Sequence, residues 1–256
     1  MKMLIDYGNT RLKWALHDRS RPGRAPTVHN GFQIGGVFAH AERSLGDALG
    51  REWESLLSPQ AVLVASVVDA QREAELAEFV RDRLGAVADF IRSPACALDV
   101  RNAYAEPERL GVDRFLALAA LHAQPRAQVL ASIGTALTID VLAANGQHLG
   151  GVICASPTLM RAALRGATAR TDANAGHVCE IAENTADAVQ SGSVLAAVAL
   201  IERVRASAAT QLNSKPVLVL TGGGADEIAA LLPDAERAAD LVLHGLARWA
   251  DAMPDR

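Results

Sequence analysis

One pattern, an apolar segment followed by a glycine turn and a second apolar segment, occurs twice in this chain. This repetition constrains the fold more than any single motif does. Near the N-terminus the apolar segment Leu4–Tyr7 leads into the turn Gly8-Asn9-Thr10 and a second apolar segment. The same order returns at Leu130–Ile133, followed by the turn Gly134-Thr135-Ala136. The two turn glycines are 126 residues apart (134 minus 8), close to half of the 256 residues. Because a fixed internal offset is typical of duplicated units, we expect two related domains, residues 1–123 and 124–256.

Short β-rich segments alternate with longer Ala- and Leu-rich segments along the whole chain, which predicts an α/β fold with mixed β-sheets flanked by helices. A third strand is expected near Thr27–Gln33 and a helix over Val37–Leu49. Three further helices are expected at Pro157–Leu164, Asn184–Ala208 and Leu241–Met253. Half of the residues are hydrophobic, so each domain has enough apolar side chains for a core.

Composition argues against several classes of protein. The 25 basic residues are outnumbered by 29 acidic ones, without the basic excess usual in nucleic-acid-binding proteins. No apolar run approaches the roughly 18 residues of a membrane span. The three cysteines form no CxxC pair, which disfavours a disulfide framework or a structural zinc site. We therefore expect a soluble, cytoplasmic protein that binds neither nucleic acid nor membrane.

The first turn has the composition of a phosphate-binding turn. Glycine allows close approach of a phosphate to the backbone, and successive N–H groups form an anion-binding concavity. Asp6 would repel phosphate, so we expect it to hold Mg²⁺ through water, while Lys13 adds positive charge. The alternative is a plain hairpin in which Asp and Asn merely favour the turn.

The second turn follows the same logic, with Thr135 as its hydroxyl, and the two turns together would clamp the phosphates in an interdomain cleft. A third glycine cluster, Gly222-Gly223-Gly224, lies between a predicted buried strand and a helix. Backbone of this kind suits the sugar or base of a nucleotide. The alternative is an ordinary strand-to-helix connector. Neither a Walker nor a Rossmann glycine motif is present, so a nucleotide would be bound by hairpin turns.

A polar segment, residues 104–114, runs into the first turn of an apolar helix that is expected from Gly111 to His122. Asp113 in the first helical turn is explained by the helix dipole alone, but the neighbouring Arg114 and the scarce tyrosine Tyr104 are not. A carboxylate near bound phosphates could accept the proton of a substrate hydroxyl during phosphoryl transfer.

Together these residues resemble a known family. The following motifs occur in the order and spacing of the type III pantothenate kinases: Asp6-Tyr7-Gly8-Asn9-Thr10, Gly111-Val112-Asp113-Arg114, Gly134-Thr135-Ala136-x-Thr138-x-Asp140, Gly150-Gly151-x-Ile153 and Thr221-Gly222-Gly223. The resemblance implies a duplicated ribonuclease-H-like fold of the actin-like ATPase superfamily. It also implies ATP-dependent phosphorylation of pantothenate, the first step of coenzyme A synthesis.

The resemblance assigns roles residue by residue. Asp113 would be the general base. The pantothenate-binding positions would be Tyr104, Gly111, Val112, Asp113, Arg114 and Thr185. The ATP-binding positions would be Asp6, Tyr7, Gly8, Asn9, Thr10, Arg11, Leu12, Lys13, Thr135, Gly222 and Gly223. Thr185 would reach pantothenate across a homodimer interface, and the long apolar helix Ala186–Ala208 is a candidate element of that interface. The alternative is that this helix belongs to the core of one chain.

This chain departs from the family pattern at two points. Ser132 stands where the family usually has an aspartate that binds a monovalent cation, K⁺ or NH₄⁺. Because a hydroxyl is a weaker ligand than a carboxylate for a hard cation, we expect a weakened or altered cation requirement. Ala155-Ser156 replaces a commoner Pro-Gly, which we expect to alter only a turn. Lone polar loop histidines usually have no role, so no function is assigned to His148 or His177.

Two other functions remain compatible with the sequence. Another kinase of the same superfamily, such as a sugar kinase, would share the turns but not Tyr104 with Gly111–Arg114. A non-enzymatic regulatory accessory protein would not need the carboxylates of Asp6 and Asp113.

Overall fold

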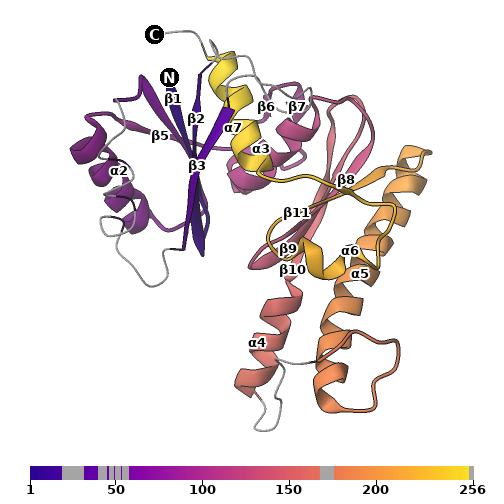
Figure 1. The fold of residues 1–256 in the computed structure, drawn as a ribbon. Helices are drawn as coiled ribbons and strands as arrows, with labels where there is room; N and C mark the ends of the chain where they lie inside the picture. Colours follow the sequence, from indigo (N-terminus) through magenta and orange to yellow (C-terminus); the bar gives the residue numbers. More distant parts are fainter. Residues whose placement is uncertain are drawn as a thin grey trace. The chain divides into compact units, whose positions relative to one another are not determined.

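The computed structural model describes residues 1–18, 32–39, 45, 49, 53, 58–167 and 176–253, and it divides the chain into two compact units. Unit 1 comprises residues 1–123 together with 241–256, and unit 2 comprises residues 124–240. Each unit contains one five-stranded sheet with helices packed on it (Figure 1). Among the described helices, none combines the length and apolar character needed to cross a bilayer.

The sheet of unit 1 has the strand order β3-β2-β1-β4-β5. The strands are β1 (Lys2–Tyr7), β2 (Arg11–His17), β3 (Phe32–Ala39), β4 (Ala61–Ser66) and β5 (Ala88–Ile91). The first three pair antiparallel, whereas β4 and β5 continue the sheet in parallel with β1. The helix α2 (Ala70–Leu84) connects the two parallel strands and is capped by the Asp69 side chain.

The sheet of unit 2 repeats this arrangement, with the order β10-β9-β8-β11-β12. Its strands are β8 (Gln128–Ile133), β9 (Ala136–Leu142), β10 (His148–Ala155), β11 (Val217–Thr221) and β12 (Glu236–Arg237). Again three strands are antiparallel and two continue in parallel. Its helices are α4 (Pro157–Ala167), α5 (Thr185–Leu212) and α6 (Ala225–Ala229). The predicted duplication is therefore confirmed by identical strand order and direction.

Alternation of side chains along the strands gives the unit 1 sheet two different faces. One face packs against α2 through a core that includes Met3, Ile5 and Tyr7. The opposite face, which includes Leu4 and Ala65, packs against α3 (Val112–Leu121) and α7 (Leu241–Ala252). Both faces are covered by helices, as a sheet with buried parallel strands requires.

The C-terminal helix α7 belongs to unit 1, so the predicted second domain of residues 124–256 extends too far along the chain. Apolar side chains of α7, Leu243, Leu246 and Ala250, are fully buried in the core of unit 1. Gly245 lies so close to the Leu116 carbonyl of α3 that a side-chain carbon would have no room. The chain thus returns to its first unit, which a division by sequence offset cannot reveal.

Two local predictions differ from the structure. β3 covers Phe32–Ala39, so Val37–Ala39 is strand and not the start of a helix. Within the predicted helix, residues 45 and 49 are helical, while residues 40–44 and 46–48 lie outside the described residues. The predicted third strand, Thr27–Gln33, overlaps β3 only at residues 32 and 33, and its residues 27–31 also lie outside the described residues.

Candidate active site

The first turn joins β1 and β2 and is closed by a hydrogen bond from the Gly8 N–H to the Arg11 carbonyl, 3.0 Å long. Asp6 on β1 lies directly opposite Lys13 on β2 in the strand register. Cross-strand neighbours of opposite charge lie close enough to attract each other. The structure therefore places the predicted Mg²⁺-binding carboxylate and the predicted phosphate-neutralising ammonium side by side, next to the turn.

Two residues of the predicted phosphate-binding segment have buried side chains. Tyr7 is 2% exposed and Leu12 fully buried, both in the core beneath α2. Burial raises the pKa of the Tyr7 phenol. Only the backbone of these two residues is available to a ligand at the turn, whereas Asn9, Thr10 and Arg11 are exposed.

Asp6 and the helix that carries Asp113 share one face of the unit 1 sheet. Asp6 alternates with Tyr7, so its side chain lies on the same face as Leu4. Leu4 packs in one cluster with Val112 and Leu116 of α3. The fold of unit 1 thus brings two motifs that are about 100 residues apart in sequence to one side of one sheet.

Asp113 occupies the first turn of α3, where a negative charge is favourable. Its Oδ1 accepts the N–H of Arg114 at 2.8 Å. A side-chain carbon placed on Gly111, the residue before the helix, would lie 2.5 Å from the same oxygen. Gly111 therefore leaves the space that the Asp113 carboxylate occupies, a role that is evident from the structure and not from the motif.

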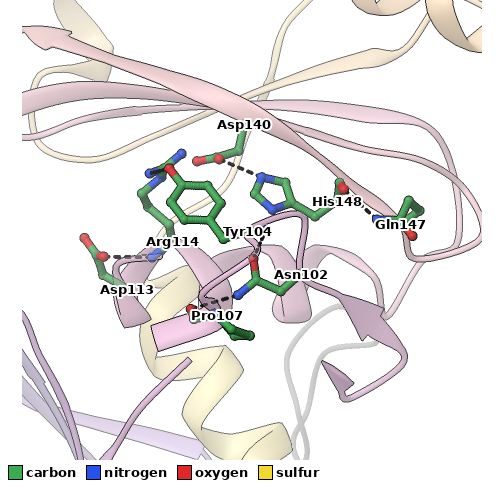
Figure 2. A network of polar contacts seen from close by, with 8 residues as sticks. All are labelled: Asn102, Tyr104, Pro107, Asp113, Arg114, Asp140, Gln147 and His148. Atoms are coloured by element: carbon green, nitrogen blue, oxygen red, sulfur yellow. Dashed lines mark hydrogen bonds and ion pairs between the residues drawn. The ribbon is translucent and has the colours of Figure 1, made fainter. Parts of the chain in front are cut away.

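Tyr104 and Arg114, both predicted from sequence, are in direct contact (Figure 2). The Arg114 guanidinium donates to the Tyr104 hydroxyl at 3.1 Å and lies 5.8 Å from the centre of the ring. Arg114 is only 6% exposed although its charge cannot be removed at physiological pH. A buried guanidinium beside a half-buried tyrosine is suited to binding a polar or anionic group.

Asn102, which belongs to none of the sequence motifs, holds the loop that carries Tyr104. Its amide donates to the Pro107 carbonyl at 3.0 Å, and its oxygen accepts the Tyr104 N–H (Figure 2). The amide also donates to the Pro94 carbonyl at 3.2 Å. Asn102 is 8% exposed. Asparagine between two prolines in an irregular segment is a signal for such backbone bonding.

The second turn, in unit 2, is closed by a 2.9 Å hydrogen bond from the Gly134 N–H to the Ala136 carbonyl. Ser132 on β8 lies opposite Thr138 on β9, in the place that Asp6 and Lys13 occupy in unit 1. Gly134 and Thr135 are exposed. This hairpin therefore presents backbone and hydroxyl groups without a charged pair.

The glycine cluster lies against the same hairpin. The Gly224 N–H donates to the Ile133 carbonyl at 3.0 Å. Gly222 has φ +90° and touches the Ile133 backbone, so no side chain fits there. Gly222 and Gly223 are exposed. The structure explains the glycines by close packing on β8 and leaves the backbone of the first two open to a ligand.

His148, to which the sequence assigned no function, is not a lone loop histidine. His148 begins β10, is 1% exposed, and its Nε2 lies 3.0 Å from Oδ1 of the equally buried Asp140 on β9 (Figure 2). Asp140 belongs to the motif of the second turn, and its partner eight residues later could not be identified without the register of the hairpin. His177 is exposed in a coil segment, and its backbone N–H donates to Asp187.

Two predictions remain: the pantothenate contact of Thr185 and the binding of metal ions. Thr185 is exposed in the first turn of α5, next to the capping residue Asn184. Within the described part of the chain, no three His, Cys, Asp or Glu side chains gather as a metal site. A cation at Asp6 would therefore depend mainly on water and ligand oxygens.

Comparison with known proteins identifies the family. The family model described as type III pantothenate kinase matches residues 2–207. The chain is similar to type III pantothenate kinases of Stenotrophomonas maltophilia strain K279a, at 43% identity over 98% of both chains, and Xanthomonas campestris pv. campestris strain 8004, at 44% over 96% of both.

Solved structures agree with the fold. A conserved putative Baf family transcriptional activator from Campylobacter jejuni has a TM-score of 0.62 at 17% identity and 97% coverage of both chains. A putative 2-dehydro-3-deoxygalactonokinase from Sinorhizobium meliloti has a TM-score of 0.59 at 14% identity, covering 98% of this chain and 99% of its own. At these identities the likeness concerns the ribonuclease-H-like fold alone. Because the family model matches residues 2–207 and the relatives align with nearly the whole chain, the chain belongs to the type III pantothenate kinase family.

Proposed function

We propose that this protein transfers the γ-phosphoryl group of ATP to the primary hydroxyl of pantothenate, which gives 4′-phosphopantothenate, the first step of coenzyme A synthesis. The observation that carries the proposal is the 43% identity with type III pantothenate kinases over 98% of the chain. The positions of Asp6, Lys13, Asp113 and Arg114 in unit 1 support it, since these are ionic groups that phosphoryl transfer uses.

In this proposal the first turn binds phosphate oxygens of ATP through its exposed backbone and the Asn9 and Thr10 side chains. Mg²⁺ fits a site with one carboxylate, Asp6, because this ion commonly keeps several waters and takes its other ligands from substrate phosphates. When bound, Mg²⁺ neutralises and orients the phosphates. Lys13, opposite Asp6, adds positive charge next to the transferred group.

Asp113 is the proposed general base. Its carboxylate accepts the proton of the pantothenate hydroxyl while that oxygen forms a bond to the γ-phosphorus, and the bond from phosphorus to the β–γ bridging oxygen breaks to release ADP. Tyr104, Gly111 and Arg114 bind pantothenate, and Val112, whose side chain is buried in the core of unit 1, contributes its backbone. Because Arg114 is held by the Tyr104 hydroxyl, its charge is positioned before substrate arrives.

The second unit contributes Thr135 to a phosphate and the exposed backbone of Gly222 and Gly223 to the nucleoside. A monovalent cation, K⁺ or NH₄⁺, fits poorly at Ser132. The opposing side chain there is Thr138, so this pair offers two neutral hydroxyls and no carboxylate. We therefore assign no catalytic step to a monovalent cation.

We further propose a homodimer in which Thr185 of one protomer contacts pantothenate bound to the other. An apolar groove of about 330 Å³ between α4 and α5 supports a second copy as the occupant. The groove is lined by Met160, Leu164, Ala188, Val189, Gly192 and Ser193. Leu159, Leu164 and Val178 are about 40% exposed in the single chain. Thr185 begins α5, the helix that carries four of the six residues lining the groove.

We place the enzyme in the cytoplasm. All three cysteines are free thiols, and Cys96 is exposed. Unbridged, accessible thiols are typical of a reducing compartment.

The test is ADP release by the purified protein with Mg–ATP and either pantothenate or a panel of sugars. The proposal predicts ADP release with pantothenate as the acceptor and with none of the sugars. Turnover with a sugar and not with pantothenate would make the chain another kinase of the same superfamily. A folded protein inactive on every acceptor would favour a regulatory accessory role.

A further inference from the structure

Ser156, which from the sequence was expected only to alter a turn, connects the second turn to the start of α4. Its hydroxyl donates to the Thr135 carbonyl at 2.9 Å. The same oxygen accepts the N–H of Leu159 at 3.2 Å. One side chain thus caps a helix and holds a turn that lies 21 residues earlier in the chain.

The two bonds use the single donor of the serine hydroxyl and one of its two acceptor lone pairs. The second bond is an N-cap, since Ser156 immediately precedes the helix and Pro157 takes its first position. The first bond has no such local explanation, because the Thr135 carbonyl belongs to the hairpin and not to α4. Ser156 is 1% exposed, which leaves little room for water to replace its hydroxyl.

The contact acts on the peptide that the second turn presents. Because a peptide group is planar, fixing the Thr135 carbonyl fixes the orientation of the whole Thr135–Ala136 peptide. The hydrogen bond that closes the turn, from the Gly134 N–H to the Ala136 carbonyl, constrains the next peptide group along the chain. Thr135 itself is exposed, so the Ser156 bond to its carbonyl holds an accessible residue in a defined position.

We infer that Ser156 is a positioning residue for ATP: its hydroxyl donor holds the Thr135 peptide of the second turn in the orientation that binds a phosphate group. The inference rests on the proposed function for the identity of the phosphate ligand. It assigns Ser156 an effect on nucleotide binding and none on pantothenate binding.

Two variants separate this role from helix capping. Ser156→Ala removes both the cap and the donor to Thr135. Ser156→Gly removes the donor and retains most of the capping, since glycine is nearly as good at this position. Ser156→Thr retains a hydroxyl and serves as the rescue. Asp69→Ala, which removes the cap of α2 in unit 1, is the matched control for loss of a cap alone.

The measurements are KM for ATP, KM for pantothenate, the Kd of Mg–ATP by calorimetry and the melting temperature. We expect Ser156→Ala and Ser156→Gly to raise the KM and Kd for ATP about 2- to 10-fold, the effect of one neutral hydrogen bond. KM for pantothenate should not change, and Ser156→Thr should resemble the wild type. Asp69→Ala should lower the melting temperature and leave the ATP constants unchanged.

If ATP affinity is unchanged in Ser156→Gly, the serine is only a cap and the inference is wrong. Should Ser156→Ala fail to fold, Ser156→Gly decides alone. A wild type that binds Mg–ATP but does not phosphorylate pantothenate would refute the proposed function only, because the Kd values still test Ser156. A wild type that does not bind Mg–ATP would refute both.

Discussion

The hairpins β1–β2 and β8–β9 occupy the same place in two sheets of identical strand order, yet they present different chemistry. In unit 1 the pair beside the turn is Asp6 and Lys13, two opposite charges. In unit 2 the corresponding pair is Ser132 and Thr138, two neutral hydroxyls. Duplication has thus preserved the backbone while the side chains at the turns have diverged.

In the proposed mechanism the two units therefore contribute different chemistry. Unit 1 holds the ionic groups Asp6, Lys13, Asp113 and Arg114, which can move a proton or offset charge. Unit 2 holds exposed backbone and hydroxyls, which can bind and orient phosphates without reacting. Variants in unit 1 should therefore act mainly on turnover, and variants in unit 2 mainly on ATP affinity.

The largest effect is expected for Asp113→Asn, which removes the proposed base from unit 1. Turnover should fall about 100- to 10,000-fold, the usual contribution of general base catalysis, while the Kd of Mg–ATP stays unchanged. Glu108→Gln, an exposed change in the neighbouring segment, is the control. Steady-state kinetics with calorimetry checks both values, and substantial activity of Asp113→Asn would remove the base role.

Gly111→Ala should come next, because its new side-chain carbon would lie 2.5 Å from the Asp113 carboxylate and displace it. A displacement of a reacting group by about 1 Å can lower turnover about 100-fold. The pH profile of kcat distinguishes displacement of a base from general damage to the fold. An unaltered kcat would show that the carboxylate reorients without loss.

Asp6→Asn compared with Ser132→Ala tests the contrast between the hairpins most simply. Loss of the charge in unit 1 should raise the Mg²⁺ concentration for half-maximal rate about 10- to 100-fold, the value of a hydrogen bond to a charged group. Ser132→Ala, which removes the hydroxyl in unit 2, should leave this Mg²⁺ concentration nearly unchanged. A titration of rate against Mg²⁺ gives both values, and equal effects would contradict the proposed division.

Gly134→Ala should separate binding from stability. The added carbon would find its nearest neighbour at 3.8 Å, so the fold accepts it, and the unfolded chain loses entropy worth roughly 0.4–1 kcal/mol. If a phosphate approaches this backbone, KM for ATP should rise about 10-fold although the protein becomes no less stable. Thermal unfolding and ATP kinetics are the two measurements. An unchanged KM would place the phosphates elsewhere.

The smallest effect is expected for Ser132→Asp, which gives unit 2 a carboxylate like that of unit 1. A charged oxygen binds a hard cation better than a hydroxyl does, so stimulation of the rate by K⁺ should increase severalfold. The comparison is made in K⁺ and in a bulky organic cation. Strict dependence of the wild type on K⁺ would overturn the prediction.

The sequence predicted the duplication, the sheet-and-helix composition and the two hairpin turns, because these depend on local patterns repeated at one offset. It could not predict that α7 returns to unit 1, since that depends on which apolar face is left uncovered. It placed Tyr7 and Leu12 in a binding segment, but their side chains pack in the core because alternate residues of a strand point to opposite faces. The contacts made by Asn102, His148 and Ser156 join residues by register and loop packing, and single motifs do not encode these.

The most direct test of the account is ³¹P NMR of the product formed from ATP and pantothenate by the wild type and by Asp113→Asn, with both proteins shown to bind Mg–ATP. We predict that the wild type yields a phosphomonoester on the primary hydroxyl of pantothenate and that Asp113→Asn yields none in the same time. Equal product from the two proteins, or phosphate transfer only to water, would contradict the assignment of the chemistry to unit 1.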